Sequence, residues 1–176
     1  MKHLTPADYT AMPWANGRGT TTELIRVNHA DGRLLWRLSM AAVVDDGAFS
    51  VFPGVERNLT VISGPGFDLV GARTLRADSL VPVAFPGDVA MAAAGVVAPS
   101  ADFNVMTCRS LARPVVRVLE AGKVAPPPGG TLCLFALAPA LAGGQGLARH
   151  DLLICHRALA VSGGPVIAVG LAEFSV

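Results

Sequence analysis

The feature that most constrains this chain is a succession of short apolar segments with a repeat of two residues, each ended by glycine or proline. Leu34–Val44 is the clearest of them, because one face is wholly apolar while the other includes Arg37 and Ser39. A repeat of two is the period of a β-strand, and convincing helical periodicity is scarce. With 19 Gly and 13 Pro between the segments, the sequence predicts an all-β sandwich or barrel.

The expected strands are spread over most of the chain. One helical turn is predicted at Thr5–Asp8, where Thr5 can cap the turn and Pro6 suits its first position. The predicted strands are Thr20–Val27, Leu34–Val44, Asn58–Ser63, Phe67–Val70, Ser79–Phe85, Asp88–Ala92, Asp102–Arg109, Val115–Ala121, Thr131–Leu137, Asp151–His156 and Val166–Ala172.

Length and charge restrict the possible partners. A chain of 176 residues suits one domain, or two half-barrels that share a core. A net charge of +1 gives no long-range field that attracts nucleic acid or a membrane surface, so neither is expected as a partner. Hydrophobic residues make up 52% of the chain, yet its long uncharged stretch, Val124–Ala148, is broken by Pro and Gly and cannot form a spanning helix. We therefore expect a large core and a homodimer interface.

The cysteines and the start of the chain indicate a compartment. Cys108, Cys133 and Cys155 are odd in number and scattered, which favours buried thiols in a reducing environment. Met1–Pro6 lacks the apolar run of a secretion signal. Both observations predict a cytoplasmic protein.

Several polar residues have unusual neighbours. Trp14 precedes a glycine turn and a threonine-rich strand, and Arg57 follows Phe52-Pro53-Gly54. Asn104 and Met106 alternate with apolar residues up to Arg109. In an open sheet, arginines at such positions face solvent, whereas in a barrel either face of a strand can line the lumen and mouth.

These stretches resemble the HutD/Ves family. The matching segments keep the expected order between residues 14 and 109, and Arg18 stands where the family usually has a glycine. The segments are Trp14–Glu23, Trp36–Ala41, Gly47–Arg57 and Asp102–Arg109.

The resemblance implies a fold and a biological setting. The fold is a cupin, an RmlC-like jelly roll or double-stranded β-helix, with two barrel halves in one chain (a bicupin). We expect residues 1–176 to form one bicupin unit, with a first half-barrel at about 14–110 and a second built from 111–176 with the N-terminal segment. The resemblance also implies a bacterial cytoplasmic protein. Some relatives are associated with histidine utilisation and others with environmental stress, and no established reaction comes with the family name.

The motifs of metal-binding cupins are missing. Such cupins place a His-x-His and a Glu on one strand and a further His on a later one, which leaves a coordination position open. Gly47–Arg57, where that motif is expected, has no histidine, and Phe85-Pro86-Gly87-Asp88 resembles the second motif's turn without a following ligand. The sequence therefore predicts neither a metal nor another cofactor. The histidines are His3, His29, His150 and His156, and none forms a His-x-His.

Two classes of function fit this chain. The first is a metal-free bicupin that senses or buffers a carboxylate metabolite of histidine utilisation, of the urocanate or formylated or formimino glutamate type, in a regulatory role. The alternative is a metal-independent isomerase, epimerase or lyase with Glu23 or Glu56 as its base. Such enzymes need a positioned acid and base, and the matching segments contain no histidine, so we expect binding and assign no catalytic residue.

The expected site combines arginines with an apolar wall. A guanidinium offers a planar fork that matches a carboxylate and stays charged when partly buried. In a rival interpretation the arginines pair with Glu23 or Glu56 and only stabilise the barrel. The predicted carboxylate contacts are Arg37, Arg57 and Arg109, the orienting polar groups are Asn16, Ser39 and Asn104, and the apolar wall is Trp14, Phe52 and Met106. Glu23 is also predicted to bind the ligand.

Overall fold

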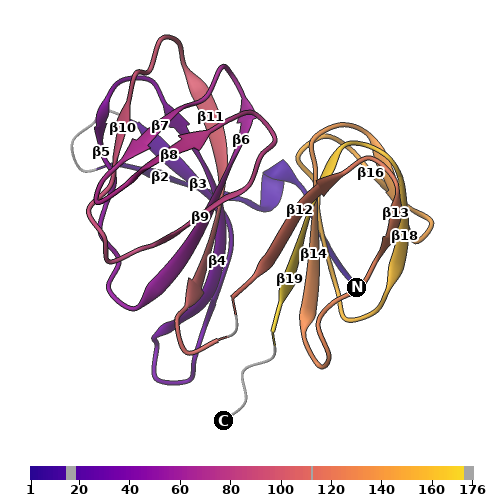
Figure 1. Cartoon of the computed structure of the whole chain (residues 1–176). Helices are drawn as coiled ribbons and strands as arrows, with labels where there is room; N and C mark the ends of the chain where they lie inside the picture. The colour runs from indigo at the N-terminus through magenta and orange to yellow at the C-terminus, as the bar shows by residue number, and fades with distance from the viewer. Residues whose placement is uncertain (15–18, 112, 173–176) are drawn as a thin grey trace. The chain divides into compact units, whose positions relative to one another are not determined.

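The computed structural model describes residues 1–14, 19–111 and 113–172, and the chain divides into two compact units. We call Thr10–Ser110 the pocket unit, and Met1–Tyr9 together with Leu111–Val176 the second unit (Figure 1). The predicted all-β fold is confirmed, because the described residues form strands and one 3-10 turn, η1 (Pro6–Asp8). At that turn the Thr5 backbone N–H donates to the Asp8 carboxylate at 2.8 Å.

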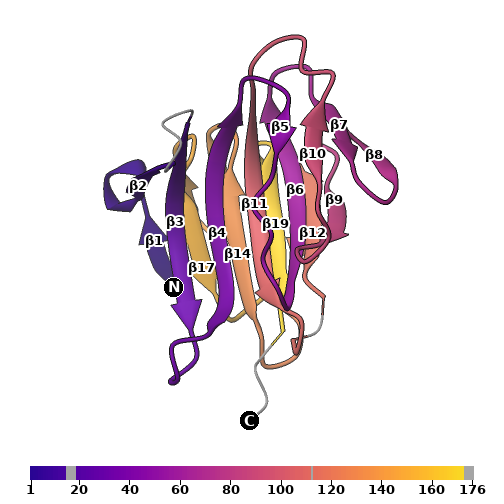
Figure 2. The ribbon, with the colours of Figure 1, turned by 90° about the vertical axis from the view of Figure 1, so that its left-hand side faces the viewer.

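The pocket unit is built from two antiparallel sheets, and Figure 2 shows β3, β4, β11 and β6 side by side. The larger sheet has the order β2 (Thr10–Pro13), β3 (Thr20–Asn28), β4 (Leu34–Val43), β11 (Ser100–Cys108), β6 (Val55–Ser63), β9 (Val83–Pro86). The smaller sheet has the order β5 (Gly47–Ala48), β10 (Ala92–Ala94), β7 (Phe67–Val70), β8 (Thr74–Ala77).

The two sheets of the pocket unit pack face to face over an apolar core. Leu59 and Val61 of β6 meet Phe67 and Leu69 of β7 there, and all four side chains are fully buried. The segment between β6 and β7 bends sharply, and its Gly66 has a φ of +78°. The backbone N–H of Gly66 donates to the Ser100 hydroxyl at 3.0 Å.

The second unit repeats this plan of two packed sheets. Leu134 of β14 and Val161 of β18 belong to its core, so the segment after Pro128 supplies core strands. Its first sheet has the order β1 (Lys2–Leu4), β17 (Leu152–Cys155), β14 (Thr131–Ala136), β19 (Val166–Leu171), β12 (Val115–Leu119). The second has the order β13 (Gly122–Val124), β18 (Leu159–Gly163), β15 (Ala140–Ala142), β16 (Gln145–Leu147).

Some strand predictions were wrong. Only the end of the predicted strand Ser79–Phe85 is a strand, and of the predicted strand Asp88–Ala92 only Ala92 belongs to a strand, as the first residue of β10. The short strands β1, β2, β5, β8, β13, β15, β16 and β18 were not predicted. Most of these are three or four residues long, so a two-residue repeat barely registers in them.

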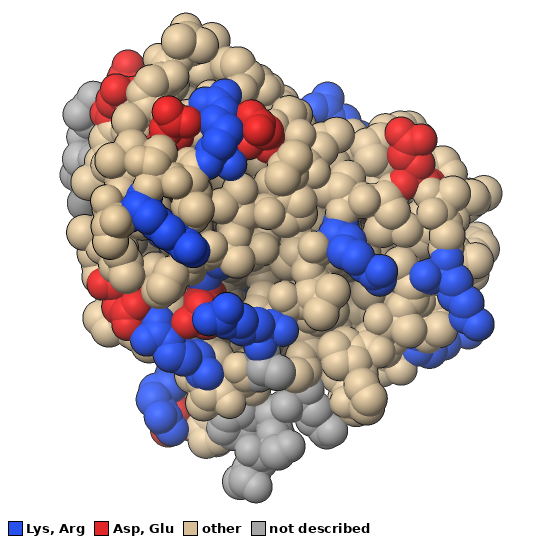
Figure 3. Space-filling model, viewed as in Figure 1, with Lys and Arg blue, Asp and Glu red and all other residues tan. Residues whose placement is uncertain are grey.

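The surface of the described chain carries few charges. On the face in Figure 3, basic and acidic side chains intermingle, with wide uncharged areas between them. Among the described residues, no helix is long and apolar enough to cross a membrane.

Candidate functional site

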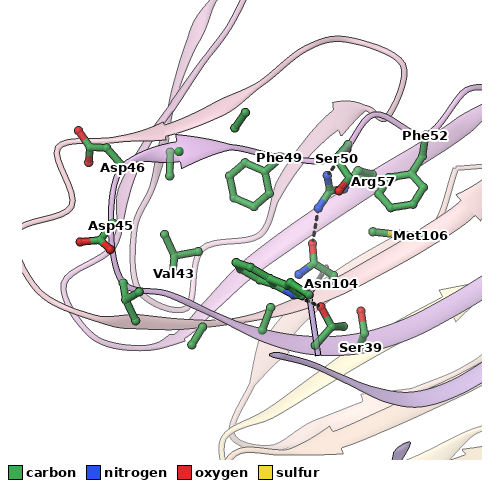
Figure 4. A pocket seen from close by; sticks show the side chains of 18 of the residues that line it. Ser39, Val43, Asp45, Asp46, Phe49, Ser50, Phe52, Arg57, Asn104 and Met106 are labelled. Carbon is green, nitrogen blue, oxygen red and sulfur yellow. Dashed lines mark hydrogen bonds between the residues drawn. The ribbon is translucent and has the colours of Figure 1, made fainter. Parts of the chain in front are cut away.

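A cavity of about 440 Å³ opens in the pocket unit. Its floor is the inward face of the larger sheet, and Figure 4 shows Asn104, Met106 and Ser39 pointing into it. Among the predicted site residues, those that line the cavity are Trp14, Arg37, Ser39, Phe52, Arg57, Asn104 and Met106.

Strand register explains why these polar residues meet. Met106 of β11 pairs with Arg37 of β4 on one side and with Arg57 of β6 on the other. One step along the sheet, Asn104 pairs with Ser39. Side chains directly opposite one another in paired strands share a face, so the alternation along each strand carries all five to the lumen. The lumen, not solvent, therefore surrounds Arg37 and Arg57, which are 9% and 5% exposed.

Arg57 is the most unusual group of the cavity. Its Nη2 donates to Asn104 Oδ1 at 3.0 Å and its Nη1 to the Ser50 carbonyl at 3.4 Å (Figure 4). Its Nε–H is buried without a hydrogen-bond partner among the described residues. A buried donor without an acceptor costs free energy, which a ligand oxygen at this position would recover.

Three aromatic rings surround the Arg57 guanidinium. Its central carbon lies 5.3 Å, 5.6 Å and 5.0 Å from the ring centroids of Phe49, Phe52 and Phe85. Ring faces attract a cation, and they also exclude water. The pKa of Arg57 is lowered to about 10, mainly by burial; the negative charge of Asp102 opposes this change and the positive charge of Arg37 adds to it. Arg57 is therefore still a cation at neutral pH.

A buried carboxyl lies behind Asn104. The Asn104 side-chain amide donates to Asp102 Oδ1, while Asp102 Oδ2 has no hydrogen-bond partner among the described residues. Asp102 is 0% exposed. Burial raises the pKa of Asp102 to about 7, and Arg57, Asn104 and the Ala41 backbone oppose that rise. Asp102 and Arg57 thus interact through Asn104 and not as a direct ion pair.

Arg37 differs from Arg57 because a carboxylate holds it. Arg37 Nε donates to Glu23 Oε2 at 2.6 Å, with side chains 11% and 20% exposed. Glu23 is not among the lining residues. The rival interpretation of a structural ion pair therefore describes Arg37 better than a free anion contact does.

Trp14 is held in place over Gly19. Its indole Nε1 donates to Thr21 Oγ1 at 2.8 Å, and its backbone N–H donates to the Gly19 carbonyl at 2.9 Å. A Cβ added at Gly19 would lie 2.8 Å from two atoms of the Trp14 ring. Real Cβ contacts are essentially never that short, so only glycine allows this placement of the indole.

Gly19→Ala is therefore expected to displace the Trp14 indole and break its bond to Thr21. In an ¹H–¹⁵N spectrum the Trp14 indole peak should shift, while that of the buried Trp36 stays. Gly47→Ala is the matched control, because Gly47 also lines the cavity and has nothing within 4 Å of an added Cβ. An unmoved Trp14 peak in Gly19→Ala would contradict this account of the wall.

The pocket contact predicted for Arg109 is corrected by the structure. Arg109 follows the end of β11 on the exposed surface and is not a lining residue. Its Nε donates to Glu56 at 2.7 Å, and its two Nη atoms donate to Asp88 at 2.6 Å and 2.9 Å. These carboxylates hold the guanidinium away from the lumen. Asn16, the remaining predicted contact, lies outside the described residues.

Sequence reasoning missed part of the site. Phe49 lies in the segment Gly47–Arg57, but loop residues have no alternation that shows which way they point. Asp102 was detectable, because it is two residues from Asn104 on the same strand and so shares its face. Asp45 and Asp46 are exposed loop residues at the cavity, and Asp46 accepts the Val96 backbone N–H at 2.8 Å.

Outside the cavity, the titratable groups of the described residues form no comparable site. Asp151 accepts from His3 at 2.8 Å and from the Ala148 backbone at 2.9 Å, while the neighbouring His150 ring stacks on Phe135. Within residues 1–14, 19–111 and 113–172, no three His, Cys, Asp or Glu side chains are grouped so that they could hold a metal ion.

A comparison with models of known protein families identifies the family of this chain. The family model described as HutD matches residues 6–163. The chain belongs to the HutD family. The resemblance expected from the four segments is thereby confirmed.

Two solved structures share the fold of nearly the whole chain, and one further relative matches part of its sequence. The structure of HutD from Pseudomonas fluorescens SBW25 (formate condition) is 27% identical with a TM-score of 0.84, over 98% of this chain and 99% of that one. A conserved protein of unknown function from Pseudomonas aeruginosa PAO1 is 28% identical with a TM-score of 0.84, covering 98% of both chains. Protein Ves of Citrobacter koseri is 36% identical over 121 residues, which is 64% of this chain and only 62% of that relative's length.

Proposed function

We propose that this HutD-family chain binds a small carboxylate-bearing metabolite in the cavity of the pocket unit, with Arg57 as the principal contact. The observation that supports this most is a cation that is 5% exposed, lines a cavity, and has an unsatisfied Nε–H. A carboxylate oxygen supplies both the missing acceptor and the counter-charge, and charge-assisted bonds of this kind are the stronger ones.

The rest of the cavity fits a small planar ligand. Ser39 and Asn104 place polar groups beside Arg57, and the walls from Phe49, Phe52 and Trp14 are aromatic. Pockets for small molecules combine much apolar surface with few polar groups in this way. Urocanate and the formylated or formimino derivatives of glutamate carry a carboxylate and a planar polar group, and the family resemblance connects them to histidine utilisation. We infer a sensing or buffering role for the bound state.

The contacts of the two candidate bases, Glu23 and Glu56, favour binding over the enzyme alternative. Glu23 accepts from Arg37, and Glu56 accepts from Arg109. Both glutamates are therefore engaged by a guanidinium, and neither is among the described lining residues of the cavity. The described lining residues also include no histidine.

A ligand screen with matched neutral analogues tests this proposal. Thermal unfolding is followed with urocanate, N-formylglutamate, formiminoglutamate and acetate, each compared with the corresponding amide. A ligand that binds only the folded state raises its melting temperature by mass action, so the carboxylates should stabilise the protein and the amides should not. If no carboxylate raises the melting temperature even at millimolar concentration, the proposal is wrong.

A further inference from the structure

Binding of a carboxylate at Arg57 would place a second anion close to the buried carboxyl of Asp102. Asp102 is fully buried, and Asn104 links its Oδ1 to the guanidinium of Arg57. With Asp102 ionised, Arg57 already has a buried counter-charge two hydrogen bonds away. A bound carboxylate then adds a second anion beside a single free cation.

Among the described residues, the charged groups around Asp102 do not supply another cation for that second anion. Arg37 is the other arginine of the lumen, but Glu23 neutralises it at 2.6 Å. The neighbouring positions on β6 and β10, Leu59 and Ala93, are uncharged. In the described part of the chain, the charged groups that face this part of the lumen are Arg57 on β6, Arg37 on β4, and the exposed Asp45 and Asp46 of the β4–β5 loop. Glu23 on β3 does not line the cavity but pairs with Arg37.

Two buried anions that share one cation do not both stay ionised when a proton is available, since each raises the cost of charging the other. Asp102 has an atom ready for that proton, because its Oδ2 has no hydrogen-bond partner in the described part of the chain. Protonation at Oδ2 leaves the bond from Asn104 to Oδ1 in place. A neutral Asp102 no longer offsets the positive charge of Arg57, so the whole of that charge attracts the ligand.

We propose that Asp102 couples binding of a carboxylate at Arg57 to the uptake of one proton from solvent, so that the pocket takes up an anion and a proton together. This inference rests on the proposed function. It makes Asp102 a positioning residue that acts through Asn104, and it makes the affinity of the pocket depend on pH.

The direction of the pH dependence follows from burial. Because burial raises the pKa of Asp102 to about 7, the free protein already holds the proton below that pH and binding there needs no uptake. Above it, each binding event takes up a proton. The Kd should therefore rise by about tenfold per pH unit above about pH 7, the limit for one coupled proton.

Acetate is the probe for this coupling, because it is the minimal carboxylate and stays ionised from about pH 6 to about pH 8.5. Its Kd is measured by NMR titration at constant ionic strength. The wild type should show the rise, and Asp102→Asn, which mimics the protonated carboxyl, should vary by less than about twofold. His29→Gln is the matched control: His29 lies in the β3–β4 turn beside Asp31, and this variant should follow the wild type.

The possible results separate failure of the proton coupling from failure of carboxylate binding. A wild-type Kd that is constant over this range, or an Asp102→Asn variant that keeps the rise, overturns the coupling and leaves carboxylate binding intact. If acetate does not bind at any pH, both proposals fall. If Asp102→Asn does not fold, calorimetry of the wild type and His29→Gln in two buffers of different ionisation enthalpy decides. Uptake of about one proton per acetate at about pH 8 in both proteins supports the coupling, and no uptake overturns it.

Discussion

Replacing Arg57 with Met is expected to weaken carboxylate binding by at least about 30-fold, because truncating a buried charged contact costs about 2–5 kcal/mol of binding free energy. The free protein should hardly change in stability. The described residues give Arg57 no carboxylate partner in an ion pair, and methionine fills the space between its aromatic rings without the desolvation cost of a buried cation.

Calorimetric titration and urea unfolding at about pH 6 measure the two effects of Arg57→Met separately. That pH keeps Asp102 largely protonated, so the loss of the neighbouring cation does not strand a buried charge. Arg57→Lys is the control, since lysine keeps the charge and loses the planar fork, and its affinity should fall between the two. If Arg57→Met binds the carboxylate with wild-type affinity, Arg57 is not a ligand contact.

Replacing Arg37 with Met is expected to lower the stability of the free protein strongly and to weaken carboxylate binding only moderately. Glu23 would keep its charge in a mostly buried position, and breaking a buried ion pair costs about 3 kcal/mol of unfolding free energy. Binding should weaken less than in Arg57→Met, because Glu23 already occupies the Arg37 guanidinium. Urea unfolding measures the loss of stability.

Two variants show whether the Arg37 effect comes from the stranded charge. Arg33→Met removes an arginine that is 77% exposed and pairs with an Asp31 side chain that is 42% exposed, so it should lower the free energy of unfolding much less than Arg37→Met does. The double variant Arg37→Met with Glu23→Gln removes both charges and should recover much of the stability. If the double variant is as unstable as Arg37→Met alone, packing and not charge explains the loss.

The contrast between the arginines marks the limit of what the sequence could predict. Alternation along Leu34–Val43 placed Arg37 and Ser39 on one face, and the family resemblance made that face the lumen of a barrel. The pairing of Arg37 with Glu23 depends on the register of β3, which shifts by one residue after Glu23. A register shift of this kind leaves no mark in a two-residue repeat, so the sequence could not tell which arginine keeps a free charge.

Strand ends and loops were the other sources of error. Alternation predicts which face of a strand a side chain occupies, but Arg109 lies just beyond the last residue of β11, where the alternation no longer applies. Phe49 reaches Arg57 from the loop before β6, and only the fold brings them together. For Asp102, the sequence shows which face of the strand it occupies. The sequence does not show that the side chain is fully buried or that its Oδ2 has no hydrogen-bond partner among the described residues.

The central claim is that the Arg57 Nε–H meets the carboxylate of a ligand. In ¹H–¹⁵N spectra of arginine side chains, the Arg57 Nε–H signal is assigned by its absence in Arg57→Met and followed during titration with acetate and N-formylglutamate. The account predicts a saturable shift of this signal with either carboxylate and none with acetamide. An Arg57 Nε–H signal that stays in place while the carboxylate binds elsewhere would contradict it.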